Sequence, residues 1–304
     1  MRQKHPQESL GSLCELFGVT RQAYYDAAAH EKKTSIAHML VLTLVREYRI
    51  DIPLMGTRKL LFLLMPDLEQ HGIKIGRDQL FELLRFHGLL IRRRRRFVKT
   101  TDSHHWLKKY PNLIKGLEVT GANQLWVSDI TYIRTLEGFS YLSLITDAFS
   151  RKIVGYCLYH TLEAVGCVNA LKMAVEGLKR DSPYFLIHHS DRGIQYCSAE
   201  YVKILEDENI AISMTQSGSP YDNALAERVN GIIKNEFYPK RIYQNHKEAL
   251  KAITKIIQIY NSKRPHASID YLTPDQAHAH EGLLSKRWKR YHRKKKSPSE
   301  PIEV

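Results

Sequence analysis

Residues 124–135, Gln-Leu-Trp-Val-Ser-Asp-Ile-Thr-Tyr-Ile-Arg-Thr, are the stretch that decides the fold of this chain. The character of the side chains alternates along this stretch, which is also rich in β-branched and aromatic residues. Both features predict a β-strand. A Leu-Glu-Gly turn at 136–138 leads to a second predicted strand, Ser140–Phe149, and a turn at 150–151 leads to a third, Lys152–Tyr159. Three strands joined by such short turns predict an antiparallel arrangement.

After these strands, helical and strand patterns alternate. The predicted elements are a helix over Leu162–Leu178, a short buried strand over Tyr184–His189, a helix over Ser198–Asp207, a short strand over Ala211–Thr215, a Gly/Ser/Pro loop at 217–222 and a long helix from Asn223. Together they predict an α/β fold with a mixed five-stranded sheet and flanking helices on both faces. The order of the elements resembles that of the ribonuclease-H-like fold.

The residues before the first strand predict helices only. Residues 9–27 have the pattern of a helix–turn–helix, in which Gly18 supplies the turn and the Thr20 hydroxyl caps a short second helix. Three further helices are expected in a second small unit: Ile36–Arg49, Thr57–Leu64, and one that Asp78 caps and that ends near Gly88.

Positive charge is concentrated in two runs. The chain has 46 Lys and Arg against 32 Asp and Glu, a net charge of +14, with a pI of about 9.5. Residues 92–99 and 281–296 hold nearly all of the excess. One such run is as easily a solvated face as a binding surface, but two in a basic protein favour a polyanionic partner, most simply nucleic acid.

These patterns give an expected domain order. It is an N-terminal helix–turn–helix (1–33), a second helical DNA-binding domain (34–95), a basic linker (96–118), a ribonuclease-H-like catalytic domain (119–280) and a basic C-terminal tail (281–304). We expect a cytosolic protein, because no stretch has the roughly 18 apolar residues of a membrane helix and the N-terminus lacks the apolar run of a signal peptide. The four cysteines are scattered, which favours neither a zinc site nor a disulfide framework.

Three acidic residues occupy informative places in the predicted fold. Asp129 lies in the middle of the first strand, where a charge is costly to bury unless something pairs with it. Asp191 follows the fourth strand, and strand C-termini are where α/β folds place ligands. Glu227 lies one turn into the last helix. A chain with 32 acids offers many such triples, so the spacing by itself would favour three unrelated acids: a surface Asp, a turn Asp and an exposed helix Glu.

Three carboxylates that meet at one site repel each other, and a divalent cation turns this repulsion into binding. Oxygen ligands without thiolates indicate magnesium or manganese rather than zinc. Two such ions about 3.5–4 Å apart can activate the attacking oxygen and stabilise the leaving oxygen of a phosphoryl displacement. The three acids therefore predict metal-dependent phosphodiester chemistry.

The residues around the acids resemble the DDE transposases, in particular the second-reading-frame protein of the insertion sequence 3 family. The matching motifs are Trp126-x-x-Asp129-x-Thr131-Tyr132, His189-Ser-Asp191-x-Gly193-x-Gln195-Tyr196, Ser219-Pro220-x-Asp222-Asn223-Ala224-x-x-Glu227 and Tyr260-Asn261-x-x-Arg264-Pro265-His266. Thirty-five residues, 192–226, separate the last two acids, which is the spacing typical of the family.

The resemblance implies that Asp129, Asp191 and Glu227 are catalytic and bind Mg²⁺, for which Mn²⁺ can substitute, as two ions. The activity implied is cleavage of DNA at the ends of an insertion sequence and transfer of the freed strand, in transposition, recombination and integration. The implied partners are double-stranded DNA, both the terminal inverted repeats and the target, and further copies of the chain. The residues expected to contact DNA are Arg21, Gln22, Arg92, Arg93, Arg94, Arg95, Arg96, Asn223, Lys234, Arg264 and His266.

Lys234 stands seven residues after Glu227, two helical turns on and so on the same face. Asn223 has a second possible role as a helix cap. Family members commonly need an upstream-frame helix–turn–helix and leucine-zipper protein, and no leucine heptad precedes the catalytic domain here.

Three other functions remain to be weighed against transposition. A catalytically silent DNA-binding regulator would keep the fold, but all three acids are present. A tyrosine or rolling-circle recombinase would need a nucleophilic Tyr among basic residues or a His-hydrophobic-His pair, which His188-His189 does not supply. A retroviral integrase would carry an N-terminal His/Cys zinc module, for which there is no counterpart.

Overall fold

The computed structural model describes residues 7–91, 107–178, 185–216, 223–237 and 242–284. The chain forms two compact units, one of residues 1–98 with 235–239 and one of residues 99–234 with 240–304. Arg92 to Arg96, the loop at 217–222 and most of the predicted C-terminal tail lie outside the described residues.

The described part of the first unit is helical. Its helices are α1 (Leu10–Leu16), α2 (Arg21–Asp51), α3 (Thr57–Gln70) and α4 (Arg77–Phe86). As predicted, Gly18 adopts a positive φ of 65° in the turn after α1, and the Thr20 hydroxyl caps α2 by accepting a hydrogen bond from the Ala23 amide at 3.1 Å. A left-handed turn followed by a side-chain cap thus fixes where α2 begins.

Two predictions about these helices were wrong. The short second helix near residue 27 and the helix over Ile36–Arg49 are one continuous 31-residue helix, α2, so the expected boundary at residue 33 falls inside it. The stretch contains neither Gly nor Pro, so nothing in the backbone interrupts the helix. The cap of α4 is Gly76; Asp78 lies in the first turn, where it pairs with Arg77 at 2.8 Å.

The second unit contains the predicted mixed sheet. Its strands are β1 (Leu125–Thr135), β2 (Gly138–Asp147), β3 (Ile153–Tyr159), β4 (Ile187–Ser190) and β5 (Ala211–Met214). Their order is β3-β2-β1-β4-β5; β1, β2 and β3 pair antiparallel, while β1 and β4 and then β4 and β5 pair parallel. This is the sheet of the ribonuclease-H-like fold, so the fold-class prediction is confirmed.

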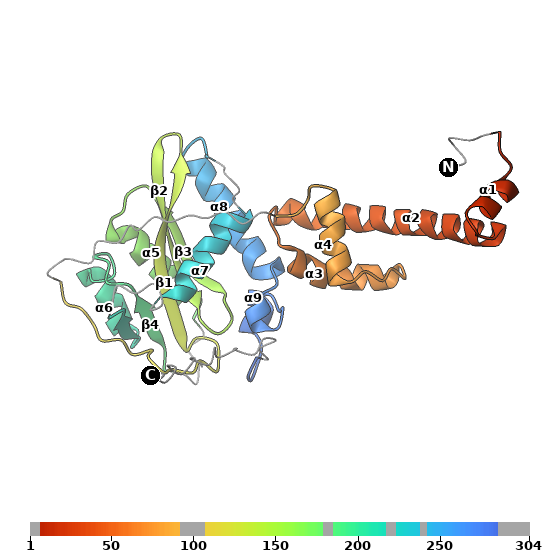
Figure 1. Ribbon diagram of the computed structural model, residues 1–304. Coiled ribbons are helices and arrows are strands. Elements are labelled where there is room, and N and C mark those ends of the chain that lie inside the picture. The colour runs from red at the N-terminus through yellow and green to blue at the C-terminus, as the bar shows by residue number, and fades with distance from the viewer. Residues whose placement is uncertain (1–6, 92–106, 179–184, 217–222, 238–241, 285–304) are drawn as a thin grey trace, which may run out of the picture. The chain divides into compact units, whose positions relative to one another are not determined.

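The helices of this unit are α5 (Ala164–Glu176), α6 (Ala199–Asp207), α7 (Ala224–Ile232), α8 (His246–Lys263) and α9 (Pro274–His278), with a π-helix η1 (Ile233–Phe237) after α7 and a 3-10 turn η2 (Ala267–Ile269). Neighbouring residues of β1 point to opposite faces of the sheet. Trp126 packs in a core with α5 and α6, whereas Leu125 and Val127 pack in a second core with Ala226 of α7. Helix α7 lies across β1 (Figure 1), and this contact positions the site described below.

The edge strand β3 is covered by α8. The Asn261 side chain accepts a hydrogen bond from the Ile153 amide at 3.0 Å and donates one to the Ile153 carbonyl at 2.9 Å. The Tyr260 hydroxyl donates to the Arg151 carbonyl at 3.0 Å. A side-chain amide therefore satisfies backbone groups that an edge strand would otherwise leave unpaired. The first residues of the motif that begins at Tyr260 thus stabilise the sheet.

Gly155 of β3 marks the closest approach of α5 to the sheet. A methyl group built at Gly155 would lie 2.1 Å from the Ala170 carbonyl oxygen and 2.8 Å from the Ala174 Cβ. At Gly177, just after α5, an added methyl would meet nothing closer than 3.6 Å. Only a residue without a side chain allows α5 to approach β3 at this distance.

We predict that Gly155→Ala lowers the free energy of unfolding by at least about 2 kcal/mol, because backbone must move to relieve the overlap. Gly177→Ala is the matched control and should change it by less than about 0.5 kcal/mol or stabilise the protein slightly. Urea unfolding followed by circular dichroism measures both. A Gly155→Ala protein as stable as the wild type would contradict the packing described here.

Candidate active site

Asp129 lies half-buried in the middle of β1, and both of its carboxylate oxygens accept hydrogen bonds. Oδ1 accepts from the Ile130 amide at 2.9 Å, and Oδ2 accepts from the Asn230 side-chain amide at 2.8 Å. Burial raises the pKa of Asp129 to about 7, and the negative charges of Asp191 and Glu227 add to this effect. The pKa is raised even though the two hydrogen bonds to the carboxylate lower it, so burial and like charge outweigh them.

Asp191 is brought to Asp129 by the pairing of two strands. Val127 of β1 lies opposite His189 of β4 in a parallel register, and continuing this register by two residues places Asp129 opposite Asp191. The Asp191 carboxylate accepts a hydrogen bond from the Gly193 amide at 2.9 Å. A methyl group on Gly193 would lie 3.0 Å from the same oxygen, so a side chain there would crowd the carboxylate.

Glu227 is held by the attachment of α7 to β1. Asn223, at the N-cap of α7, donates from its side-chain amide to the Ser128 carbonyl at 2.8 Å, and Asn230 donates to Asp129. Glu227 lies four residues after Asn223 and three before Asn230, so the three side chains share one face of the helix. Burial raises the pKa of Glu227, and the charge of Asp191 raises it further. Each of the three predicted acids is thus within electrostatic reach of another.

Behind the acids, a buried polar network joins β1 to β4 and α6. The His188 Nε2 lies 2.7 Å from the Ser128 hydroxyl and 2.9 Å from the Tyr201 hydroxyl. Burial lowers the pKa of His188 to about 3, so its imidazole is neutral at physiological pH. A neutral ring between two hydroxyls holds the two strands in register, and we assign it no part in the chemistry.

The residues predicted to contact DNA fall in different environments. Arg21 and Gln22 are exposed at the start of α2, where Gln22 donates to Asp26 at 2.9 Å. Asn223 is buried, and its side chain makes no cap hydrogen bond, so the capping role considered for it is wrong. The Lys234 ammonium lies 4.1 Å from the centre of the Tyr132 ring. Lys234 lies in the π-helix η1, which begins at Ile233, whereas Glu227 lies in the α-helix before it.

Arg264 and His266 are buried rather than available to DNA. Their exposed fractions are 1% and 6%. The Arg264 guanidinium lies 5.8 Å from the Tyr260 ring centre, and the His266 ring packs edge-to-face on the same tyrosine at 5.1 Å. Direct contact of either side chain with DNA, as predicted from the motif, is not what this structure supports. The match identified residues that pack the end of α8.

Sequence reasoning missed Asn230 and Asp147. Asn230 stands three residues after Glu227, and helical spacing alone would have placed it on the same face. Asp147, at the end of β2, is completely buried and accepts hydrogen bonds from the Asn123 amide, the Ser150 amide and the Ser150 hydroxyl, each at 2.7 Å. Its charge is therefore well compensated within the protein.

The donor chemistry of the three acids fits a hard divalent cation. All three would present carboxylate oxygens, the ligands that magnesium and manganese prefer. Within the described residues, no three His, Cys, Asp or Glu side chains already stand close enough together to hold a metal ion. The carboxylates would therefore have to draw together around an ion, as mutually repelling groups do when a cation joins them.

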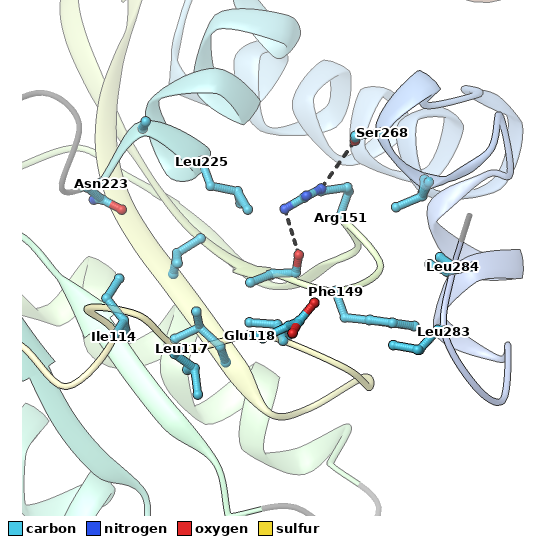
Figure 2. A pocket seen from close by; sticks show the side chains of 16 residues that line it. Ile114, Leu117, Glu118, Phe149, Arg151, Asn223, Leu225, Ser268, Leu283 and Leu284 are labelled. Carbon is cyan, nitrogen blue, oxygen red and sulfur yellow. Dashed lines mark hydrogen bonds between the residues drawn. The ribbon is translucent and has the colours of Figure 1, made fainter. Parts of the chain in front are cut away.

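A cavity of about 510 Å³ lies beside the start of α7 (Figure 2). Its walls are largely apolar, with Asn223 and Leu225 from the start of α7 on one side and Leu283 and Leu284 on the other. Arg151 also faces it and is tethered to the Ala148 carbonyl at 2.6 Å and the Ser268 hydroxyl at 3.4 Å. None of the three acids lines this cavity, so it is distinct from the carboxylate site.

None of the helices within the described ranges combines the length and apolar character that a membrane span requires.

The chain matches family models over most of its second unit. Two models described as integrase core domain match residues 119–220 and 208–274. A protein of Shigella sonnei named insertion element IS600 uncharacterized 31 kDa protein is 36% identical, over 86% of this chain and 96% of the relative. The transposase for insertion sequence element IS904 of Lactococcus lactis is 32% identical, over 68% and 82%. The transposase InsF for insertion sequence IS3fB of Escherichia coli is 29% identical, over 90% and 96%.

The fold and these matches define a class first: the chain is an integrase-core enzyme that recombines DNA. Within that class it belongs to the DDE transposases of the insertion sequence 3 family, and its function is DNA transposition. The resemblance seen in the sequence motifs is thereby confirmed.

The contrast between Asp129 and Asp147 gives a test of the site's electrostatics. The raised pKa of Asp129 means that its protonated form stabilises the fold at low pH, and this contribution is lost as pH rises through about 7. In metal-free buffer at pH 8, Asp129→Asn should therefore raise the melting temperature, by about 2 °C or more. Asp147→Asn should lower it, because an amide cannot accept all three hydrogen bonds.

Differential scanning fluorimetry at pH 5 and pH 8, with and without Mg²⁺, measures both variants. Added Mg²⁺ should raise the melting temperature of the wild type and leave Asp129→Asn nearly unchanged. If Asp129→Asn were less stable than the wild type at pH 8, the electrostatic description of this carboxylate would be wrong.

Proposed function

We propose that Asp129, Asp191 and Glu227 are the catalytic carboxylates of this transposase and that together they hold two Mg²⁺ ions, for which Mn²⁺ can substitute. The observation that carries the proposal is the electrostatic coupling of the three acids, which come from three different parts of the fold. The negative charges of Asp191 and Glu227 both raise the pKa of Asp129, and the charge of Asp191 also raises the pKa of Glu227. A protein that only bound DNA would gain nothing from carrying this repulsion.

The chain's own residues orient each carboxylate, and bound ions would then draw the three together. Ile130 and Asn230 orient Asp129, the Gly193 amide orients Asp191, and the attachment of α7 to β1 positions Glu227. Bound there, the ions would supply activation of the attacking oxygen and stabilisation of the leaving oxygen at a DNA phosphodiester. Preorganised ligands reduce the reorganisation that the reaction requires.

The substrate we propose is double-stranded DNA, with cleavage at the terminal inverted repeats of the element and joining to target DNA. Lys234, held over the Tyr132 ring of β1, would contact a phosphate of the DNA backbone. The helical unit that includes Arg21 and Gln22 would recognise the ends, and the two basic runs would add contacts that do not depend on sequence. Further copies of the chain on the DNA would complete the assembly.

We predict that Asp129→Asn, Asp191→Asn and Glu227→Gln each reduce strand cleavage and joining by about a thousandfold or more while DNA binding is kept, because each amide retains shape and loses charge. Double variants should be little worse than single ones, since the three act as one site. Asp207→Asn, an exposed acid at the end of α6, is the control.

Cleavage and joining are measured on labelled element ends with Mg²⁺, and chelation of the metal should abolish both. Any one of the three variants retaining most of its activity would remove that residue from the site. Loss of DNA binding in parallel with activity would point to a folding defect instead of a catalytic one.

We further predict that Lys234→Ala weakens binding of element ends by about three- to tenfold and reduces the dependence of log affinity on log salt by about 0.9, the value of one lost phosphate contact. Lys251→Ala removes the same charge from an exposed position on α8 and should do neither. Fluorescence anisotropy from low to moderate salt measures both. Equal slopes for Lys234→Ala and the wild type would exclude the contact.

A further inference from the structure

Two asparagines tie the catalytic helix to the central strand. Asn223 and Asn230 lie seven residues apart on α7, two helical turns, and are therefore on one face. Each donates from its side-chain nitrogen at 2.8 Å, Asn223 to the Ser128 carbonyl and Asn230 to the Asp129 carboxylate. Both side chains are buried, with exposed fractions of 7% and 6%. The two contacts are matched in length, burial and donor, and they differ in what accepts the hydrogen bond.

The difference in acceptor separates two roles. A hydrogen bond to the Ser128 carbonyl attaches the helix to the strand backbone. The hydrogen bond to Asp129 instead holds a side chain that can otherwise rotate. Because the Ile130 amide holds the other oxygen, the Asp129 carboxylate is fixed at both ends, and each oxygen keeps a lone pair for a further ligand.

The side-chain nitrogen of Asn230, and not its oxygen, makes the contact that matters. The Asn230 Oδ1, like the Asn223 Oδ1, is buried and has no hydrogen-bond partner in the described part of the chain. A buried polar atom without a partner destabilises the fold, and an apolar side chain of the same size would avoid that cost. The benefit of an amide here must therefore lie in the contact with Asp129.

We infer that Asn230 is a positioning residue of the active site, which holds the Asp129 carboxylate in the orientation that binds the divalent cation. This inference rests on the proposed function. Groups that orient a metal ligand typically change metal affinity by about 10- to 100-fold when they are removed. Asn261, which bonds the backbone of the edge strand β3, should have no such effect.

The test measures metal binding directly on the full chain. Asn230→Leu keeps the size of the side chain and removes its donor. Asn261→Leu is the control, because Asn261 donates to the Ile153 carbonyl of β3 at 2.9 Å and contacts none of the three acids. Free Mn²⁺ is followed by electron paramagnetic resonance during titration of each protein. We expect the Kd for Mn²⁺ to rise about tenfold or more in Asn230→Leu and to stay within about threefold of the wild type in Asn261→Leu.

Strand cleavage as a function of Mn²⁺ concentration gives a second readout. In Asn230→Leu the metal concentration for half-maximal rate should rise with the Kd, while the rate at saturating metal recovers to within a few-fold of the wild type. A general loss of packing would lower the saturating rate instead. Asn230→Ser and Asn261→Ser repeat the comparison with smaller side chains, in case the leucine variants do not fold.

Wild-type affinity for Mn²⁺ in both position-230 variants would overturn the inference, as would an equal loss in the position-261 controls. Asp129→Asn distinguishes this failure from failure of the proposed function. If Asp129→Asn bound Mn²⁺ as tightly as the wild type, the carboxylate site itself would be wrong. If only Asp129→Asn lost affinity, the site would stand and Asn230 would be excluded from it.

Discussion

The repulsion among three carboxylates is the constraint on which the rest of the second unit depends. Asp129 is removed from water on the central strand and lies within the electrostatic reach of Asp191 and Glu227. Each contribution opposes its ionisation, and only two hydrogen bonds favour it. A protein can maintain such an arrangement only if other interactions hold the three acids in place.

Those interactions come from three different parts of the fold. If the parallel register of β1 and β4 is continued past Val127 and His189, Asp191 lies opposite Asp129. The neutral His188, which lies between the Ser128 and Tyr201 hydroxyls, stabilises this pairing of the strands. The third acid, Glu227, lies on a helix that is tied to β1 by side-chain amides on both sides of it. The edge of the sheet is closed by Asn261, and the absence of a side chain at Gly155 lets α5 approach the opposite face.

The sequence predicted the strands and their order well, because the alternation of side chains and the turn residues are read from neighbouring positions and do not depend on tertiary contacts. It failed where the outcome depends on what a residue contacts. Nothing local distinguishes one long α2 from two helices, since no residue between Arg21 and Asp51 interrupts a helix. Arg264 and His266 were expected to contact DNA because their motif resembles that of the family, and the sequence could not show that both are buried beside Tyr260. Asn230 went unnoticed because an amide carries no charge signal.

The fully buried Asp147 and the half-buried Asp129, on neighbouring strands, show how the protein separates structure from function. Asp147 receives three short hydrogen bonds, so its charge is compensated within the fold and stabilises the turn between β2 and β3. Asp129 receives two and faces two like charges, so its compensation is incomplete. A carboxylate whose charge is compensated by hydrogen bonds within its own protein has little affinity left for a cation. A carboxylate without that compensation is stabilised when a cation binds to it. The metal binding that we propose for this site would therefore follow from the stability that the fold gives up at Asp129.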